Sequence, residues 1–323
     1  MKEITISEND AGQRINKFLM KYLNNAPSSF IYKMLRKKNI KLNNKKADGS
    51  EILSGGDTVQ IYLSDETISN FRVEEKTYQA PQTDIDIIYS DDNILIANKP
   101  AGMLSQKAAK DDYSFNEAMI NYLVAKGRLT KEQLATFKPS VCNRLDRNTS
   151  GIILCGISLK GSQELSKIIR ERQLDKYYYT IVSGCMKESI DSKCYLVKNN
   201  EKNISYITDK PHGDEKCELI HTVYYPVKSN DTYTLLKVKL ITGKSHQIRA
   251  HLKYLGYPVV GDRKYGDKNT NIYFKKKYGI DNQMLHCGEV VFHELSGDLS
   301  YLSGKKFVAE FPVKFDNVVS NLF

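Results

Sequence analysis

A polar turn joins two apolar segments in the stretch Val141–Gly151, whose sequence is VCNRLDRNTSG. The apolar run Ile152–Cys155 follows at once and predicts a strand that resumes after the turn. An aspartate in such a turn is most often a turn former, because its carboxylate accepts backbone hydrogen bonds. Asp146, however, lies between Arg144 and Arg147, and nearby cations keep a carboxylate ionised. Since an ionised carboxylate can act as a nucleophile, Asp146 is the candidate catalytic residue.

Two later stretches carry further side chains suited to chemistry. The run Tyr177–Tyr179 has the composition of a strand, in which the middle ring faces away from the other two. Such a run is ordinary in a half-buried strand, although a tyrosine hydroxyl can also exchange a proton. A helix is predicted from a Ser245 N-cap to Leu255, because Gly256 and Pro258 follow it. The first turn of this helix carries His246, Gln247 and Arg249.

The sequence shows no spacing typical of a metal site. Its six cysteines never form Cys-x-x-Cys, and its six histidines never form His-Glu-x-x-His. One acidic group is close in sequence: Asp84, Asp86, Asp91 and Asp92. Asp91 and Asp92 lie within the segment 90–93 between two apolar runs, and Asp84 and Asp86 precede it, so a turn explains these acids better than a metal does. We therefore expect no bound metal.

The order of these motifs resembles that of the RluA family of RNA pseudouridine synthases. Residues 143–151 match the family pattern His-Arg-Leu-Asp-x-x-Thr-Ser-Gly, except that Asn143 replaces the histidine. Other family motifs follow in the expected order: Asn98–Gly102, Lys176–Tyr179 with Val182–Gly184, Leu240–Arg249 and Gln283–Cys287. The resemblance extends from about residue 85 to the C-terminus. It implies conversion of uridine to pseudouridine within RNA, in which the N1–C1′ bond breaks and C5 joins C1′.

The resemblance also implies roles for individual residues. Asp146 acts as a nucleophile or a base, at the sugar or at the base ring, and Arg249 pairs with it. Tyr178, from the family motif Lys-x-Tyr, joins them in the active site. Further substrate-binding residues are Arg144, which enters the RNA helix where the base leaves, Leu285, which packs against the base, His246 and Gln247. Because substrate and product are isomers, we expect no cofactor and no energy source.

Residues 1–66 are predicted to form a small N-terminal module. Amphipathic patterns indicate one helix through Ile15–Tyr22 and a second that Ser28 or Ser29 caps, followed by strands at 40–42 and 58–62. The segment from Lys33 to Lys46 contains cations and no acid, and it spans the end of the second helix and the next strand. These cations form either an ordinary solvated face or a surface for phosphates. The cations assigned to RNA binding are Lys33, Arg36, Lys37, Lys38 and Lys41.

Short segments of this module resemble the S4 RNA-binding domain. The matching segments are Arg14–Leu19, Ser29, Lys41–Asn43 and Gly56–Val59, although Asn16 stands where an aspartate is usual. We therefore expect an α+β protein with an S4-like α/β module at 1–66, a linker at 67–83 and a pseudouridine-synthase-like catalytic domain at 84–323. The catalytic domain is expected to have a mixed, mainly antiparallel sheet flanked by helices.

Length and charge agree with an RNA partner. The 323 residues favour two domains, and the net charge of +10 favours a polyanion. The sequence lacks a run of 18 apolar residues and an export signal, so we expect no membrane span and a cytoplasmic location. The S4 resemblance favours 23S-type ribosomal RNA as the substrate, and a monomer is expected. The alternatives are a transfer-RNA-specific pseudouridine synthase, an inactive RNA-binding or ribosome-assembly factor, and a metal-dependent nuclease.

Overall fold

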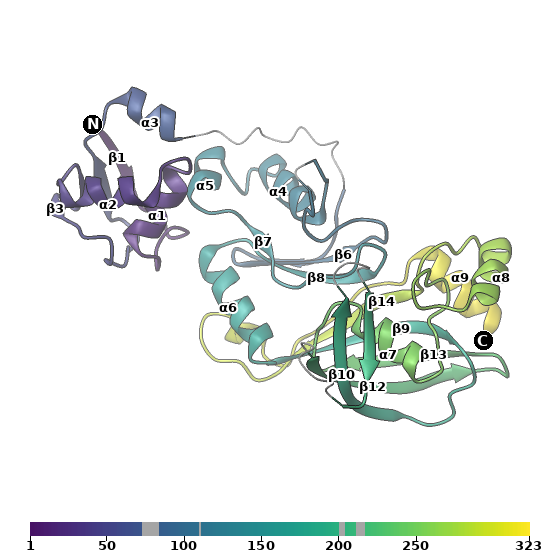
Figure 1. Ribbon diagram of the computed structural model, residues 1–323. Helices are drawn as coiled ribbons and strands as arrows, with labels where there is room; N and C mark the ends of the chain where they lie inside the picture. The colour runs from purple at the N-terminus through teal and green to yellow at the C-terminus, as the bar shows by residue number, and fades with distance from the viewer. Residues whose placement is uncertain (73–83, 110, 200–203, 211–216) are drawn as a thin grey trace.

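The computed structural model describes residues 1–72, 84–109, 111–199, 204–210 and 217–323 (Figure 1). The N-terminal module and the rest of the chain have separate sheets and separate hydrophobic cores. The module is the purple lobe of Figure 1, and the larger domain follows in teal, green and yellow. No helix of the described residues is long and apolar enough to cross a membrane.

The N-terminal module combines a small antiparallel sheet with short helices. Its elements are β1 (Lys2–Thr5), α1 (Ile15–Tyr22), α2 (Ser28–Arg36), β2 (Ile40–Leu42), β3 (Lys45–Lys46), β4 (Thr58–Ile61) and α3 (Asp65–Phe71). The strands lie in the order β1-β4-β2-β3. The apolar residues that recur along α1 are all buried, which confirms this helix and its face: Ile15, Phe18, Leu19 and Tyr22. Both predicted strands of the module are confirmed as β2 and β4.

Two details of the module differ from the sequence-based expectation. The serine cap predicted for α2 is wrong, because Pro27 is the N-cap and no side chain caps the helix. The Pro27 carbonyl accepts the first helical bond, from the Phe30 amide at 2.9 Å, so the fixed proline backbone starts the helix. The second difference is α3, which continues to Phe71, past the expected limit at residue 66. Its Ile68 belongs to the module's core, and the rest of the expected linker, 73–83, lies outside the described residues.

The larger domain is built on one long, mixed sheet. Its strands are β5 (Asp86–Ser90), β6 (Ile94–Lys99), β7 (Ser140–Val141), β8 (Ser150–Gly156), β9 (Leu174–Ser183), β10 (Ile190–Asn199), β11 (Ile204–Thr208), β12 (Cys217–Ser229), β13 (Tyr233–Leu240), β14 (Leu285–Phe292) and β15 (Lys306–Val308). The main order is β11-β10-β12-β13-β9-β14-β8-β6-β5. Among the described pairs, β14 and β8 run parallel and the others are antiparallel, which confirms the predicted fold class.

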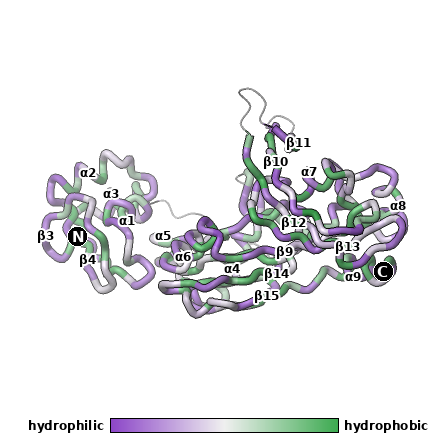
Figure 2. The backbone as a smooth tube through the Cα atoms, turned by 90° about the horizontal axis from the view of Figure 1, so that it is seen from below, coloured by the Kyte–Doolittle hydropathy of each residue, from purple (hydrophilic) through white to green (hydrophobic). Residues whose placement is uncertain are grey.

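Helices cover both sides of this sheet. They are α4 (Phe115–Ala125), α5 (Lys131–Thr136), α6 (Leu159–Arg170), α7 (Gln247–Tyr254), α8 (Lys268–Tyr278) and α9 (Val313–Leu322). Helices α6 and α7 share a core with alternate residues of β6, β8 and β9. Helices α4, α8 and α9 pack against residues that point the other way from the same strands. Figure 2 shows β10 and β11 projecting from this body as a hairpin.

The parallel contact between β8 and β14 requires a glycine. Ser150 and Gly151 pair with His286 and Cys287 at this point. Gly151 has a φ of +112°, and a Cβ there would lie 2.2 Å from the Cys287 carbonyl oxygen. Any side chain would therefore separate the two strands. The junction matters for function because the loop of residues 142–149, called here the Asp146 loop, enters β8 directly before it.

Replacing Gly151 with alanine should therefore destabilise the fold. Overpacking against backbone and a left-handed backbone together should cost about 3 kcal/mol or more of unfolding free energy. Chemical denaturation measures this loss. Gly304→Ala is the matched control, because Gly304 also has a positive φ, of +69°, but no atom lies within 4 Å of its added Cβ. Equal effects of the two variants would contradict the close approach at Gly151.

Candidate active site

Asp146 and Arg249 form an ion pair across the larger domain. Nη1 of Arg249, on α7, donates to Oδ2 of Asp146 at 2.7 Å. The opposite edge of the same guanidinium forms a bidentate pair with Asp262. In this pair Nε donates to Oδ2 at 2.6 Å and Nη2 donates to Oδ1 at 2.9 Å. The side chain of Asp146 is 27% exposed, against 6% for Arg249 and 0% for Asp262. One buried arginine therefore holds a buried carboxylate on one side and a partly exposed one on the other.

The electrostatics of the site favour the charged forms of Arg249 and Asp262. Burial lowers the pKa of Arg249, but the hydrogen bonds and charges of Asp262 and Asp146 outweigh it, and the pKa lies above its usual value. Burial raises the pKa of Asp262, yet the Arg249 guanidinium and backbone amides hold it below its usual range. Those amides belong to Lys264 and Tyr265, at 2.8 and 3.0 Å from Oδ1. Arg249 is thus a fixed cation in front of Asp146.

Asp262 is the residue that sequence reasoning missed. It follows two buried valines, Val259 and Val260, and begins a short loop, so it reads as an ordinary turn former. A buried arginine needs an acidic partner, and Asp262 follows Arg249 by 13 residues. The presence of this acid was the only sequence signal for the pair. Sequence spacing alone does not distinguish this acid from other acids on turns.

The Asp146 loop is held from behind by the segment 99–105. The Ser105 hydroxyl donates to the Leu145 carbonyl at 2.9 Å and accepts from the Leu145 amide at 3.0 Å. Lys99, which has no exposed surface, donates to three carbonyls, those of Pro100, Met103 and Arg147, at 2.9, 2.7 and 3.2 Å. Burial lowers the pKa of Lys99 to about 7, although the charge of Asp146 raises it. These bonds explain why the Asn98–Gly102 motif accompanies the loop.

Asn143 holds the start of the same loop. Its Oδ1 accepts from the Leu154 amide at 2.7 Å, and its Nδ2 donates to the Ile152 carbonyl at 3.3 Å. The side chain is buried and tied to β8, away from the ion pair. The asparagine that replaces the family histidine therefore anchors the loop to the sheet.

The structure brings Tyr178 and Leu285 to the same core as the Asp146 loop. Tyr178 and Leu285 lie on neighbouring strands, β9 and β14, and pack in one cluster with Leu145. Burial, then the neighbouring Cys287 thiol and the charge of Asp146, raise the pKa of the Tyr178 phenol well above its usual value. Tyr177 and Tyr179 face the other side, where the Lys237 amine lies 4.5 and 5.7 Å from their ring centres. The predicted alternation of the three rings is confirmed.

His246 also reaches the site, whereas Gln247 does not. Nε2 of His246 lies 4.0 Å from Oδ2 of Asp146, and Nδ1 lies 2.9 Å from the Tyr265 hydroxyl. Burial lowers the pKa of His246. The side chain of Gln247 is buried and fully bonded within the protein, accepting from the Lys244 amide at 3.0 Å and donating to the Thr222 hydroxyl at 2.8 Å. It holds the loop before α7 rather than offering a free polar atom.

The predicted N-cap of α7, Ser245, is wrong, because the Gln247 side chain is bonded to the loop before the helix. The helix begins at Gln247, its N-cap is His246 with a left-handed φ of 57°, and Ser245 lies outside it. The bond from the Lys244 amide to the Gln247 side chain closes the preceding loop, so the helix begins one residue later than expected. The left-handed N-cap turns His246 toward Asp146. Arg249 lies in the first turn, as predicted.

The remaining predicted site residues lie on surfaces. Arg144 is an exposed residue of the Asp146 loop. In the module, the end of α2 and the turn after it carry exposed Lys33, Arg36, Lys37 and Lys38. Lys41 is half-buried, and its amine lies 5.0 Å from the ring centre of Tyr62. No ion pair of the described residues includes any of these cations, so their charges are free for a partner.

The acidic stretch near residue 90 forms a turn. Oδ1 of Asp91 accepts from the amides of Asn93 and Ile94 at 2.7 and 2.9 Å. Within the described part of the chain, no group of three or more histidines, cysteines and acids could hold a metal ion. The turn hypothesis therefore explains Asp91.

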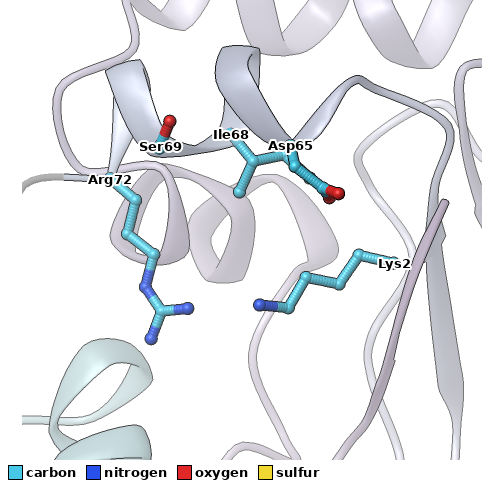
Figure 3. Close-up of a pocket in the computed structure, with 5 residues that line it drawn as sticks. All are labelled: Lys2, Asp65, Ile68, Ser69 and Arg72. Carbon is cyan, nitrogen blue, oxygen red and sulfur yellow. The ribbon is translucent and has the colours of Figure 1, made fainter.

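A hollow of the N-terminal module lies apart from these residues (Figure 3). It is lined by Lys2, Asp65, Ile68, Ser69 and Arg72. Figure 3 shows the cationic ends of Lys2 and Arg72 turned toward each other, and both lie over the ring of Tyr22, at 5.9 and 4.8 Å from its centre. None of the predicted catalytic residues lines this hollow, so it is not the catalytic site.

Comparison with known proteins identifies the class. The family model described as RNA pseudouridylate synthase matches residues 93–254. A ribosomal large subunit pseudouridine synthase C of Vibrio cholerae is 31% identical over 90% of this chain and 88% of its own length. A ribosomal large subunit pseudouridine synthase D of Borreliella burgdorferi is 28% identical over 100% and 93%.

A solved structure agrees with this fold. The human RNA pseudouridylate synthase domain containing 4 is 20% identical, covers 73% of this chain and 92% of its own, and superposes with a TM-score of 0.57. The chain belongs to the RNA pseudouridylate synthase family, with the RluA-type enzymes that its motifs resemble. It is an RNA pseudouridine synthase, an isomerase that acts on RNA.

The buried position of Asp262 predicts a large stability effect. Asp262→Asn keeps the side-chain volume but leaves Arg249 with half its negative partners, and breaking a buried pair costs about 3–5 kcal/mol. Denaturant unfolding should show this loss. The control is Asp281→Asn, whose carboxylate pairs with Lys275 at 3.0 Å on the surface and should matter little. Similar stabilities for the two variants would contradict the structural role of Asp262.

Proposed function

We propose that this chain isomerises uridines in large-subunit ribosomal RNA and that Asp146 is its catalytic carboxylate. The substrate class follows from the relatives of Vibrio cholerae and Borreliella burgdorferi, both of which are named ribosomal large subunit pseudouridine synthases. The observation that carries the assignment of Asp146 is its 2.7 Å ion pair with the buried Arg249. This pair places a partly exposed carboxylate between a buried guanidinium and a buried aromatic ring.

The chemistry needs such a carboxylate. Breaking the N1–C1′ bond leaves positive charge on the ribose, and a carboxylate stabilises or attacks a sugar centre of that kind. Arg249 fixes the direction of the carboxylate through a charge-assisted hydrogen bond. Tyr178 and Leu285 support this proposal because they present an aromatic and an apolar surface in the same core, on which a flat uracil ring can pack.

Access to the uridine requires that the base leave the RNA stack. Extruding a base costs a few kcal/mol, which contacts in the pocket offset. Arg144 is proposed to enter the RNA where the base leaves, since it is exposed on the Asp146 loop. His246 is proposed to contact the substrate, because its ring lies 4.0 Å from the Asp146 carboxylate.

The N-terminal module is proposed to bind RNA as an S4-like domain. Its support is the cluster of cations on α2 and β2 without ion-pair partners among the described residues. The proposal includes no cofactor, because an isomerisation needs no second reactant. It also includes a monomeric state and a cytoplasmic location. A transfer-RNA substrate is the alternative that the substrate test below separates.

Asp146→Asn should abolish pseudouridine formation. The amide cannot supply the negative charge, so the rate should fall about 10³-fold or more. Tritium release from C5-labelled uridine in ribosomal and transfer RNA transcripts measures both activity and substrate. Circular dichroism should show an unchanged fold, because Asp262 still holds Arg249.

The control for this variant is Asp298→Asn, which removes an exposed acid from the surface and should keep full activity. Substantial tritium release by Asp146→Asn would contradict the assignment of the catalytic carboxylate. Wild-type release from transfer RNA but not from ribosomal RNA would replace the proposed substrate with the alternative.

Removing cations of the module should weaken the salt dependence of RNA binding. In Lys37→Ala/Lys38→Ala, each lost phosphate contact should lower the slope of log affinity against log salt by about one unit. Fluorescence anisotropy at several salt concentrations measures the slope. Lys160→Ala/Lys167→Ala is the control, because it removes the same charge from exposed positions on α6. Equal slopes for the two double variants would show that the module's cations make no specific contact.

A further inference from the structure

Lys176 is a partly buried cation for which the preceding sections give no role. It belongs to β9, two residues before Tyr178, and alternation along a strand places both side chains on one face. The lysines of the opposite face have acidic partners: Lys239 pairs with Asp175 at 2.7 Å, and Lys237 pairs with Glu289 at 2.9 Å. No ion pair of the described residues includes Lys176. Burial lowers its pKa, with the Cys287 thiol as the neighbouring titratable group.

The amine of Lys176 lies beside the loop that leads into α7. A Cβ added to Gly243 would stand 3.8 Å from Nζ of Lys176. Gly243 belongs to the loop that leads into α7, and therefore to His246 and Arg249. The Cys287 thiol, which neighbours both Lys176 and Tyr178, lies on β14 next to the same face. The amine is thus between the loop before α7 and the aromatic ring that lies near Asp146.

Lys99 shows by contrast what a structural buried lysine looks like here. All three of its donors are used by the carbonyls of Pro100, Met103 and Arg147. Lys176 has no such bond among the described residues. Partial burial without an acidic partner disfavours the charged form of this amine, and a ligand that brings negative charge would offset that cost.

The reaction itself generates that charge. When the N1–C1′ bond breaks, the electron pair stays on N1, and the detached uracil becomes an anion whose charge spreads over N1, O2 and O4. The base then turns, and C5 supplies the electron pair of the new C5–C1′ bond. C5 loses its proton to a base and N1 takes up a proton, so substrate and product remain isomers. Asp146 faces the positive sugar, and a second, cationic group is needed for the anion.

We propose that the ammonium group of Lys176 binds a carbonyl oxygen of the target uracil and stabilises the detached uracil anion. This inference depends on the proposed function, because it assigns the leaving group of the same reaction. A charge-assisted hydrogen bond to an oxyanion in a water-poor site strengthens as the negative charge develops. Lys176 is accordingly a catalytic residue that acts on the base, whereas Asp146 acts on the sugar and Arg249 positions Asp146.

The test compares Lys176 variants on two RNA substrates. Lys176→Met removes the charge at similar length, and Lys176→Arg keeps it. Each is assayed in single turnover on RNA that contains uridine or 5-fluorouridine at the target position, and RNA affinity is measured separately. Fluorine withdraws electrons, so the departing 5-fluorouracil anion is less basic and depends less on an external cation. Consumption of either nucleoside is followed by nuclease digestion and chromatography.

Lys176→Met should slow the uridine reaction by about 100-fold with little change in RNA affinity. Its relative loss on 5-fluorouridine should be several-fold smaller, and Lys176→Arg should recover part of the rate on uridine. The matched control, Lys239→Met, removes a lysine from the opposite face and should keep the wild-type rate on both substrates. Asp146→Asn should be equally inactive on both, since fluorine does not replace the carboxylate.

An equal loss on the two substrates, an unchanged rate, or a loss confined to RNA affinity would overturn the role of Lys176. Failure of the proposed function would give a different result. The wild-type protein itself would then convert no uridine in any ribosomal RNA transcript, whatever the Lys176 variants do.

Discussion

The site depends on one guanidinium that is shared between two carboxylates. Arg249 bonds Asp262 through two nitrogens and Asp146 through the third. An arginine this buried is costly unless its charge is matched, and Asp262 supplies the buried match. Asp146 pairs with the same guanidinium and remains partly exposed. The same bonds tie α7, the Asp146 loop and the loop after Val260 into one unit, so the geometry of the acid is set by residues that do not meet the substrate.

Two supports bring this unit to its place above the sheet. From behind, Lys99 donates to the Arg147 carbonyl and Ser105 to the Leu145 carbonyl, and these bonds help to fix the shape of the Asp146 loop. At its end, Gly151 lets β8 approach β14 so closely that the loop arrives next to Leu285. Tyr178 lies on the next strand. The proposed catalytic carboxylate and the proposed base-binding surfaces therefore come from separate elements that a single strand junction aligns.

Charge has different tasks in different parts of the chain. Inside the larger domain, Arg249 and Lys99 are fully bonded and serve the geometry of the loop. Lys176 is partly buried without a described partner, which suits a group that meets negative charge only when substrate is bound. On the module, the exposed lysines at the end of α2 suit phosphates, whose contacts are sequence-independent. The positive residues of this chain thus include some that fix the loop geometry, one proposed to meet the base and others proposed to bind phosphates.

The sequence by itself determined the helices and strands whose apolar residues repeat locally, such as α1 and β9, and it identified Asp146, Tyr178 and Arg249 through their motifs. Local order decides such features, because periodicity and turn chemistry act over a few residues. Only the tertiary structure decided that Asp262 binds two nitrogens of Arg249 and that the Gln247 side chain bonds the loop before α7. It likewise decided that Lys176 has no acidic partner among the described residues. These facts depend on contacts between segments far apart in sequence, and no local pattern records which charges become neighbours when the chain folds.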